Sequence, residues 1–162
     1  MAASDELPPA SGAEQHYRAL ERLYASAPVN LKFASRLHIP GEGRSQLTFT
    51  VTPEDYHAAG AAHGTIYFKM LDDAAFYAAN TLATDRFLLT TSFNLHFTKP
   101  VRAGIVTAEG RWVSGRRRVF VAEARLIDAE GDEIGRGTGT FMRSRMALSS
   151  LPGYAADGPS GL

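Results

Sequence analysis

Gly64 and Asp72 are the two residues of this sequence that are best suited to chemistry. Gly64 follows His63 and opens a long apolar segment, residues 64–83, in which Asp72 is a misplaced charge. If the segment is a helix, Gly64 stands at the end with unpaired N–H groups and a positive dipole, and Asp72 follows about two and a half turns later. A helix start can hold a developing oxyanion, and a carboxylate in apolar surroundings can activate water or attack a carbonyl. Together they predict acyl transfer to water.

Asp72 and its neighbour Asp73 point in different directions on such a helix, because consecutive residues are rotated by about 100°. Asp73 shares a face with Lys69 and Asn80, which predicts a polar stripe with an ordinary ion pair and no need for a function. The face of Asp72 is mainly apolar and carries Thr65, Phe68, Ala75, Phe76 and Ala79. A carboxylate without a partner would be costly there. A partnered core aspartate or a frayed surface position explains this pattern as well as a catalytic residue does.

Length and composition describe one soluble domain with a sizeable core. The chain has 162 residues, 44% of them hydrophobic, and no run near the roughly 18 apolar residues of a membrane span. Basic and acidic residues balance at 17 each, so no overall charge favours nucleic acid. The absence of cysteine excludes disulfides, thiolate metal sites and a cysteine nucleophile. It fits a reducing compartment, and no secretory signal is visible, so we expect a cytoplasmic protein with no membrane or nucleic-acid partner.

The domain that must position Gly64 and Asp72 spans residues 13–145. Residues 1–12 and 146–162 are rich in small and polar residues, which predicts a disordered N-terminal tail and a flexible C-terminal tail. Residues 14–26 have apolar side chains at helical spacing and end before Pro28, which predicts an amphipathic helix. Residues 31–39 and 45–52 are interpreted as two strands of a hairpin.

From Arg86 onward the hydrophobic period changes to two. Phe93, Leu95 and Phe97 alternate with polar residues, and turn residues at 114–116 and 129–132 separate the strands that follow. The predicted order is therefore helix, two strands, one long helix and four strands. Short connections favour an antiparallel sheet with the long helix buried against it, an α+β architecture.

The sequence resembles the hotdog-fold acyl-CoA thioesterases, most closely their phenylacetate-pathway (PaaI-like) branch. The resemblance covers residues 31–142 and rests on His63-Gly64-Thr65, Asp72 nine positions after the histidine, Ser92-Phe93-Asn94-Leu95-His96-Phe97, Lys99-Pro100-Val101-Arg102-Ala103-Gly104 and Gly135-Arg136-Gly137-Thr138-Gly139-Thr140-Phe141. It implies a sheet wrapped around one long central helix, and hydrolysis of an acyl-CoA thioester to the free acid and coenzyme A. It further implies that the Gly64 N–H polarises the thioester carbonyl, His63 supports this turn, Asp72 is general base or nucleophile, and Thr90 holds water.

Two positions depart from the family pattern. Thr65 replaces a second glycine, and a threonine is tolerable near a helix start. His57 replaces an asparagine, which leaves open whether the carbonyl receives a second donor. Thr90 and Thr91 are alternatives for the water-holding position, because a shift of one residue puts a strand side chain on the opposite face.

Helix geometry adds a condition on the assembly. Gly64 and Asp72 of one straight helix are roughly 12 Å apart, too far to act on one thioester. Two antiparallel helices at a twofold interface would place Gly64 of one chain near Asp72 of the other, twice per dimer. The resemblance implies such homodimers too, often paired into homotetramers.

The remaining candidates are weaker. Arg116-Arg117-Arg118 is better interpreted as a solvated turn, with contact to coenzyme A phosphates as the alternative. Phe68 is a core residue or part of an acyl pocket. The five histidines lack metal-ligand spacing, so we expect no metal site. The alternating glycines from Gly135 to Gly139 lack a dinucleotide-binding spacing and suggest a small-residue strand against the buried helix.

The sequence therefore favours an acyl-CoA thioesterase that needs no cofactor beyond the coenzyme A of its substrate. One alternative is a hotdog dehydratase or hydratase, although that type resembles His-Phe-Pro followed by a helix glutamate, and here Gly64 follows His63. The other is a non-catalytic acyl-CoA-binding regulator, although binding alone would not require a costly carboxylate at Asp72.

Overall fold

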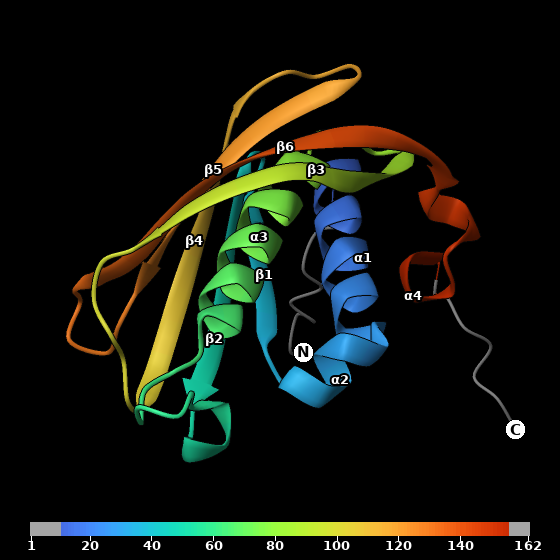
Figure 1. The fold of residues 1–162 in the computed structure, drawn as a ribbon. Coiled ribbons are helices and arrows are strands. Elements are labelled where there is room, and N and C mark those ends of the chain that lie inside the picture. The colour runs from blue at the N-terminus through green and yellow to red at the C-terminus, as the bar shows by residue number, and fades with distance from the viewer. Residues whose placement is uncertain (1–10, 156–162) are drawn as a thin grey trace, which may run out of the picture.

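The computed structural model describes residues 11–155 as an antiparallel sheet curved around one long helix (Figure 1). The elements are α1 (Gly12–Ser26), α2 (Pro28–Phe33), β1 (Arg36–Gly41), β2 (Arg44–Val51), the 3₁₀ turn η1 (Pro53–Asp55), α3 (Gly64–Asn80), β3 (Arg86–Phe97), β4 (Gly104–Ser114), β5 (Val119–Ile127), β6 (Glu133–Ala147), the 3₁₀ turn η2 (Leu148–Ser150) and α4 (Pro152–Ala155). The six strands lie in the order β1-β2-β4-β5-β6-β3. The predicted α+β hotdog architecture is confirmed.

The central helix α3 begins at Gly64 because His63 caps it. The His63 backbone is extended, and its Nδ1 accepts a hydrogen bond of 3.1 Å from the Thr65 N–H, the role that serine or aspartate usually has at a helix start. At the other end Asn80 is fully buried. Its side chain donates to the Ala83 carbonyl and accepts from the Leu88 N–H, so the end of α3 is joined to the start of β3.

Small residues let α3 lie close to the sheet. A Cβ at Gly110 of β4 would stand only 2.0 Å from the Ala74 carbonyl oxygen of α3, so glycine is required there. The same oxygen accepts a hydrogen bond of 2.5 Å from Ser45 Oγ on β2. These contacts fix the depth at which α3 lies in the sheet, and therefore the height of Gly64 and Asp72 above it.

The edge strand β3 carries a β-bulge in its pairing with β6. Thr90 lies opposite Phe141 and Ser92 opposite Thr140, so Thr91 is the extra residue. A bulge reverses which side chains face the helix. Leu88 and Thr90 face α3 before the bulge, and Phe93 contacts α3 after it.

The alternating glycines of β6 serve two purposes. Gly135 faces α3, because a Cβ there would lie 3.1 Å from the Tyr67 ring. Gly137 and Gly139 instead make room for the Phe93 ring of β3, which would be 2.5 and 2.6 Å from their Cβ atoms. Gly135 therefore packs against α3 directly, and Gly137 and Gly139 do so through Phe93, which contacts Phe68 of that helix.

Two predicted boundaries are wrong. Residues 31–33 belong to the helix α2 and not to a strand, because Pro28 starts a helical turn and Ala34 ends it in the left-handed conformation. A flexible tail was expected from residue 146, but residues 146–155 are folded. Leu148 is fully buried, and the Tyr154 hydroxyl lies 2.7 Å from Nδ1 of His16 on α1.

The predicted N-terminal tail falls largely on residues 1–10, which lie outside the described part of the chain, as do residues 156–162. Gly12 of that tail already belongs to α1, which Ser11 caps through its side chain. Within residues 11–155, no helix has the length and apolar character of a membrane span.

Candidate active site

Gly64 has a backbone N–H without a hydrogen-bond partner among residues 11–155, as expected at the first position of a helix. Gly64 lines a groove of about 440 Å³, here called the Gly64 groove. The groove is lined by His57, Ala62, Gly64, Tyr67, Phe97, Thr98, Lys99 and Pro100. A free N–H at a positive helix end can donate to a carbonyl oxygen that gains negative charge.

His57 contributes a second polar atom to the Gly64 groove. Its Nδ1 accepts a hydrogen bond of 3.0 Å from the Ala59 N–H within a turn. In the neutral ring the proton must then be on Nε2. The His57 ring can thus offer an N–H donor in the groove that contains the Gly64 N–H.

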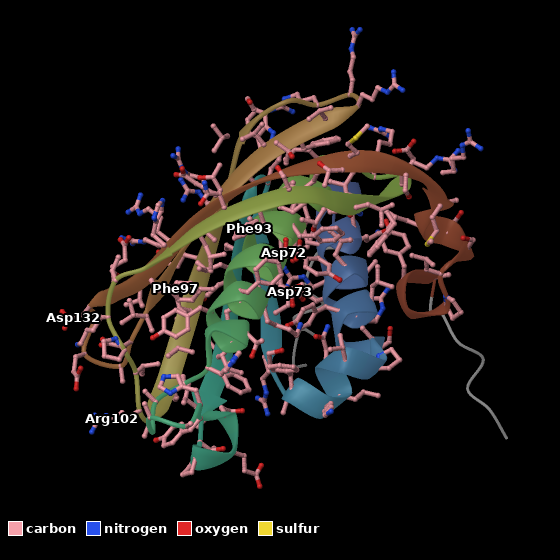
Figure 2. All side chains as sticks on the ribbon, viewed as in Figure 1. Asp72, Asp73, Phe93, Phe97, Arg102 and Asp132 are labelled. Atoms are coloured by element: carbon pink, nitrogen blue, oxygen red, sulfur yellow. The ribbon has the colours of Figure 1, made fainter. Side chains whose placement is uncertain are left out.

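Asp72 lies on a different surface, between α3 and α1 (Figure 2). Its Oδ1 accepts a hydrogen bond of 3.0 Å from the Thr90 hydroxyl. Thr91, in the bulge, bonds to Thr140 on β6 instead. Of the two threonines left open by the sequence, Thr90 is therefore the one in contact with Asp72.

The surroundings of Asp72 form a second groove of about 290 Å³, here called the Asp72 groove. It is lined by Tyr24, Ala27, Val29, Asn30, Lys69, Asp72, Asp73, Phe76, Tyr77, Phe87, Leu88, Leu89 and Thr90. Burial among these mainly apolar groups raises the pKa of Asp72 to about 6, although the hydrogen bond from Thr90 opposes this. A carboxylate with a pKa near neutrality can exchange protons at physiological pH, which suits a base.

The polar stripe predicted for Asp73 is present, but it is largely buried. The predicted ion pair with Lys69 is present, but the side chains of Lys69 and Asp73 are only 13% and 21% exposed. Asn80, on the same face, is fully buried. The stripe faces α1 and α2, and the helical pattern alone could not reveal these two covering helices.

The two grooves have no residue in common, so Gly64 and Asp72 do not share a cavity within one chain. This agrees with their separation of roughly 12 Å along a straight helix. Phe68, between them on α3, lines neither groove. It packs on Phe93 at 5.7 Å between ring centroids and remains 43% exposed.

The arginine turn, Arg116–Arg118, lies far from Gly64. Arg116 stacks on the Trp112 ring at 4.5 Å and pairs with Glu42 at 3.3 Å. The Trp112 backbone bonds to Gly43, which bonds to the Thr81 hydroxyl just beyond the C-terminal end of α3. Gly64 is at the opposite end of this helix, roughly 25 Å away.

A cluster of acidic side chains borders the Gly64 groove at Lys99. Asp128, Glu130 and Asp132 have carboxylate oxygens close enough together for a metal ion. The ammonium of Lys99 lies among them, 2.8 Å from Asp128 and 2.7 Å from Asp132, and these carboxylates raise its pKa. The Lys99 ammonium therefore offsets part of the negative charge of this cluster.

The sequence interpretation missed the residues that α1 and α2 bring to the Asp72 groove. Tyr24 and Asn30 line it from these helices. Their spacing along the chain carries no signal of a common site. The one available hint was an asparagine inside a short helical turn, and Asn30 is indeed buried and bonded to Lys69.

Comparisons with known proteins show similarity to thioesterases and esterases. Residues 59–134, which include both Gly64 and Asp72, match the model of the thioesterase superfamily. A protein of Saccharolobus solfataricus with the provisional name of an esterase is 28% identical over 101 residues, 62% of this chain and 67% of that protein.

Solved structures show the same fold. The PaaI protein of the E. coli phenylacetic acid degradation operon matches with a TM-score of 0.77 at 18% identity, over 85% of this chain and 99% of that one. A thioesterase of Haemophilus influenzae matches with a TM-score of 0.69 at 19% identity, over 78% and 88% of the two chains. The chain thus has the hotdog fold, and the match of residues 59–134 to the thioesterase superfamily indicates a thioester hydrolase.

Proposed function

We propose that the protein hydrolyses an acyl-CoA thioester to the free acid and coenzyme A, at sites shared by two protomers. The observation that carries the proposal is the division of the chemistry between two grooves of one helix. One groove holds an unpartnered Gly64 N–H, and the other holds Asp72 with a raised pKa and a bond from Thr90. Neither groove alone has both a polarising donor and a base.

A homodimer would bring the two grooves together. β3 is an outer strand of the sheet, so one of its edges has unpaired backbone groups. Phe68, Leu89 and Phe97, near this edge, are exposed apolar side chains. Antiparallel pairing of β3 with β3 of a second copy would cover them and would set the two α3 helices antiparallel across a twofold axis. Association of two such dimers into a tetramer remains a prediction.

In the proposed mechanism the thioester carbonyl oxygen accepts a hydrogen bond from the Gly64 N–H, and the His57 ring is the candidate for a second donor in the same groove. His63 holds the helix start in place through its bond to Thr65. Asp72 of the partner chain either removes a proton from water as the water attacks the carbonyl carbon, or attacks that carbon itself. Collapse of the tetrahedral intermediate breaks the C–S bond, and coenzyme A leaves as a thiolate that takes up a proton. If Asp72 is the nucleophile, its carboxylate then carries the acyl group as an anhydride, and water hydrolyses this anhydride to release the free acid. Thr90 orients the carboxylate and the water.

The remaining parts of the proposal follow from this chemistry. The mechanism needs no cofactor other than the coenzyme A of the substrate. Phe68, exposed beside the proposed interface, would line the acyl pocket of the dimer. A cytoplasmic location remains a prediction from the sequence.

Two alternative functions are less well supported. A dehydratase or hydratase of this fold would need a carboxylate and a histidine to act together, but His63 bonds to its own helix start. A binding regulator would not need Asp72, because burial in an apolar groove makes ionisation of this carboxyl group costly and raises its pKa.

Release of free thiol from a panel of short, long and aryl acyl-CoA substrates tests the proposal. Hydrolysis of at least one substrate, with a dimer or tetramer observed on sizing, is the expected result. A protein that binds acyl-CoA and releases no thiol from any member of the panel would contradict enzymatic function and favour a regulator.

We expect that replacing Arg116, Arg117 and Arg118 together with serine raises KM for an acyl-CoA. The same acyl group on N-acetylcysteamine, which lacks the nucleotide, should be affected much less, because guanidinium groups bind phosphates. In the proposed dimer the arginine turn lies toward the partner's Gly64. Steady-state kinetics on both substrates measure the difference.

Arg125→Ser is the matched control, since Arg125 is an exposed arginine of the same sheet that pairs with Glu109. It should change neither KM. Equal changes on both substrates in the triple variant would remove the arginine turn from the substrate-binding residues.

A further inference from the structure

Lys69 supplies the one positive charge among the residues that line the Asp72 groove in the described part of the chain. It precedes Asp72 by almost one helical turn, and its ammonium bonds to Asp73 and donates a hydrogen bond of 2.6 Å to Oδ1 of Asn30 on α2. The ammonium also lies 5.2 Å from the centre of the Tyr24 ring on α1. Three helices therefore hold this largely buried charge in one place.

Lys69 forms an ion pair with Asp73 and not with Asp72. Asp72 instead accepts a hydrogen bond from the Thr90 hydroxyl. Asp72 Oδ2 consequently has no hydrogen-bond partner within residues 11–155, and this oxygen is available to water or substrate. A direct ion pair with Lys69 would make Asp72 a weaker base, because an adjacent cation favours the ionised form. The observed arrangement compensates the charge of the neighbouring carboxylate and leaves Asp72 reactive.

The carboxylates of Asp72 and Asp73 line the same mainly apolar groove, so their negative charges repel each other there. Two ionised carboxylates in such surroundings disfavour each other, so without compensation one of them would stay protonated. β3 contributes no titratable group to the groove, only Phe87, Leu88, Leu89 and Thr90. The phenols of Tyr24 and Tyr77, from α1 and α3, have pKa values raised by burial and stay neutral. Lys69 is the group that can balance Asp73.

We propose that Lys69 and Asp73 form a positioning pair that sets the charge state of Asp72: by neutralising Asp73, Lys69 allows Asp72 to ionise at neutral pH. The pair acts through Asp72 and need not touch the substrate. The inference rests on the proposed function, since it concerns the base of that same site. Burial is the main cause of the raised pKa of Asp72 and the Thr90 hydrogen bond opposes it; in addition, Asp73 raises this pKa and Lys69 lowers it.

The acid limb of the pH profile of kcat/KM tests this inference. Lys69→Met leaves two uncompensated carboxylates, and the limb should move to higher pH by about one unit or more. Asp73→Asn leaves the Lys69 charge facing Asp72 alone, and the limb should move to lower pH. The double variant Lys69→Met/Asp73→Asn removes both charges, and its limb should return close to the wild-type position.

Folding is monitored by thermal unfolding, because either single variant leaves a buried charge unpaired. The double variant replaces the ion pair with neutral groups of similar size and is expected to fold. Lys32→Met, which removes an exposed lysine of α2, is the matched control and should leave the limb in place. If both single variants lose activity equally at every pH and the limb stays fixed, the pair is structural only and the inference is wrong.

A second measurement separates this inference from the proposed function. The carboxyl carbon of Asp72, assigned by comparison with Asp72→Asn, is titrated by ¹³C NMR in the substrate-free protein and in the three variants. Shifts of its pKa in the directions given above support the pair even if no thioester is hydrolysed, in which case the proposed function alone fails. Hydrolysis by the wild type together with an unmoved pKa in both single variants overturns the pair alone.

Discussion

Asp72→Asn is expected to lower the kcat of thioester hydrolysis by about 10²- to 10⁴-fold, the usual cost of losing a positioned base. The amide has nearly the shape of the carboxylate and can still accept the hydrogen bond from Thr90, so the fold and the acyl-CoA affinity should persist. Thiol-release kinetics measure the first effect. Sizing, thermal unfolding and calorimetric binding of acyl-CoA measure the others.

Two neighbouring threonines provide graded controls for this experiment. Thr90→Val removes the hydroxyl that bonds to Asp72 and should cause a smaller loss of kcat, while Thr91→Val removes one that bonds to Thr140 and should be nearly silent. An Asp72→Asn protein that keeps more than about a tenth of wild-type kcat would show that Asp72 is neither base nor nucleophile.

Mixed dimers of Gly64→Pro and Asp72→Asn should recover activity that neither parent has. Proline at this position lacks the N–H but is tolerated at the first position of a helix. In a mixed dimer both lesions fall on one of the two composite sites and the other site is native, so up to about half of the native activity per dimer should return. Differently tagged chains, purified sequentially for both tags, allow this activity to be assayed.

Gly64→Ala is the control for crowding at the helix start, because it keeps the N–H and adds a Cβ only 3.3 Å from the Phe97 ring. Sizing must first show that each Gly64 variant forms dimers. Mixed dimers as inactive as both parents would mean that Gly64 and Asp72 do not act across an interface, and the oxyanion donor would have to be sought near Asp72 in its own chain.

The fold could be predicted from the sequence where the hydrophobic period is long and regular. The apolar run after Gly64 and the alternation of Phe93, Leu95 and Phe97 indicate a buried helix and a strand, and both are present. Within the site, the same helical arithmetic correctly gave the Lys69–Asp73 ion pair.

Features that depend on contacts between distant segments were not predictable. The bulge at Thr91 places Thr90, and not Thr91, in contact with Asp72. No local pattern predicts the bulge, because strict alternation counted backward from Phe93 would place Thr91 on the helix-facing side. The burial of Asp73 depends on α1 and α2, which are remote from α3 in sequence. The folded segment 146–155 has a tail-like composition but is held by Leu148 and Tyr154 against the rest of the chain.

The contact between His16 and Tyr154 has a consequence for re-engineering the chain. Gly12, Gln15 and His16 at the start of α1 line one hollow together with Tyr154 and Ala155 of α4, so the two ends of the described chain lie side by side. Neither end belongs to the Gly64 groove or to the Asp72 groove. A short linker could therefore join Ser11 to Ala155 and give a circular permutant in which the join lies outside both grooves.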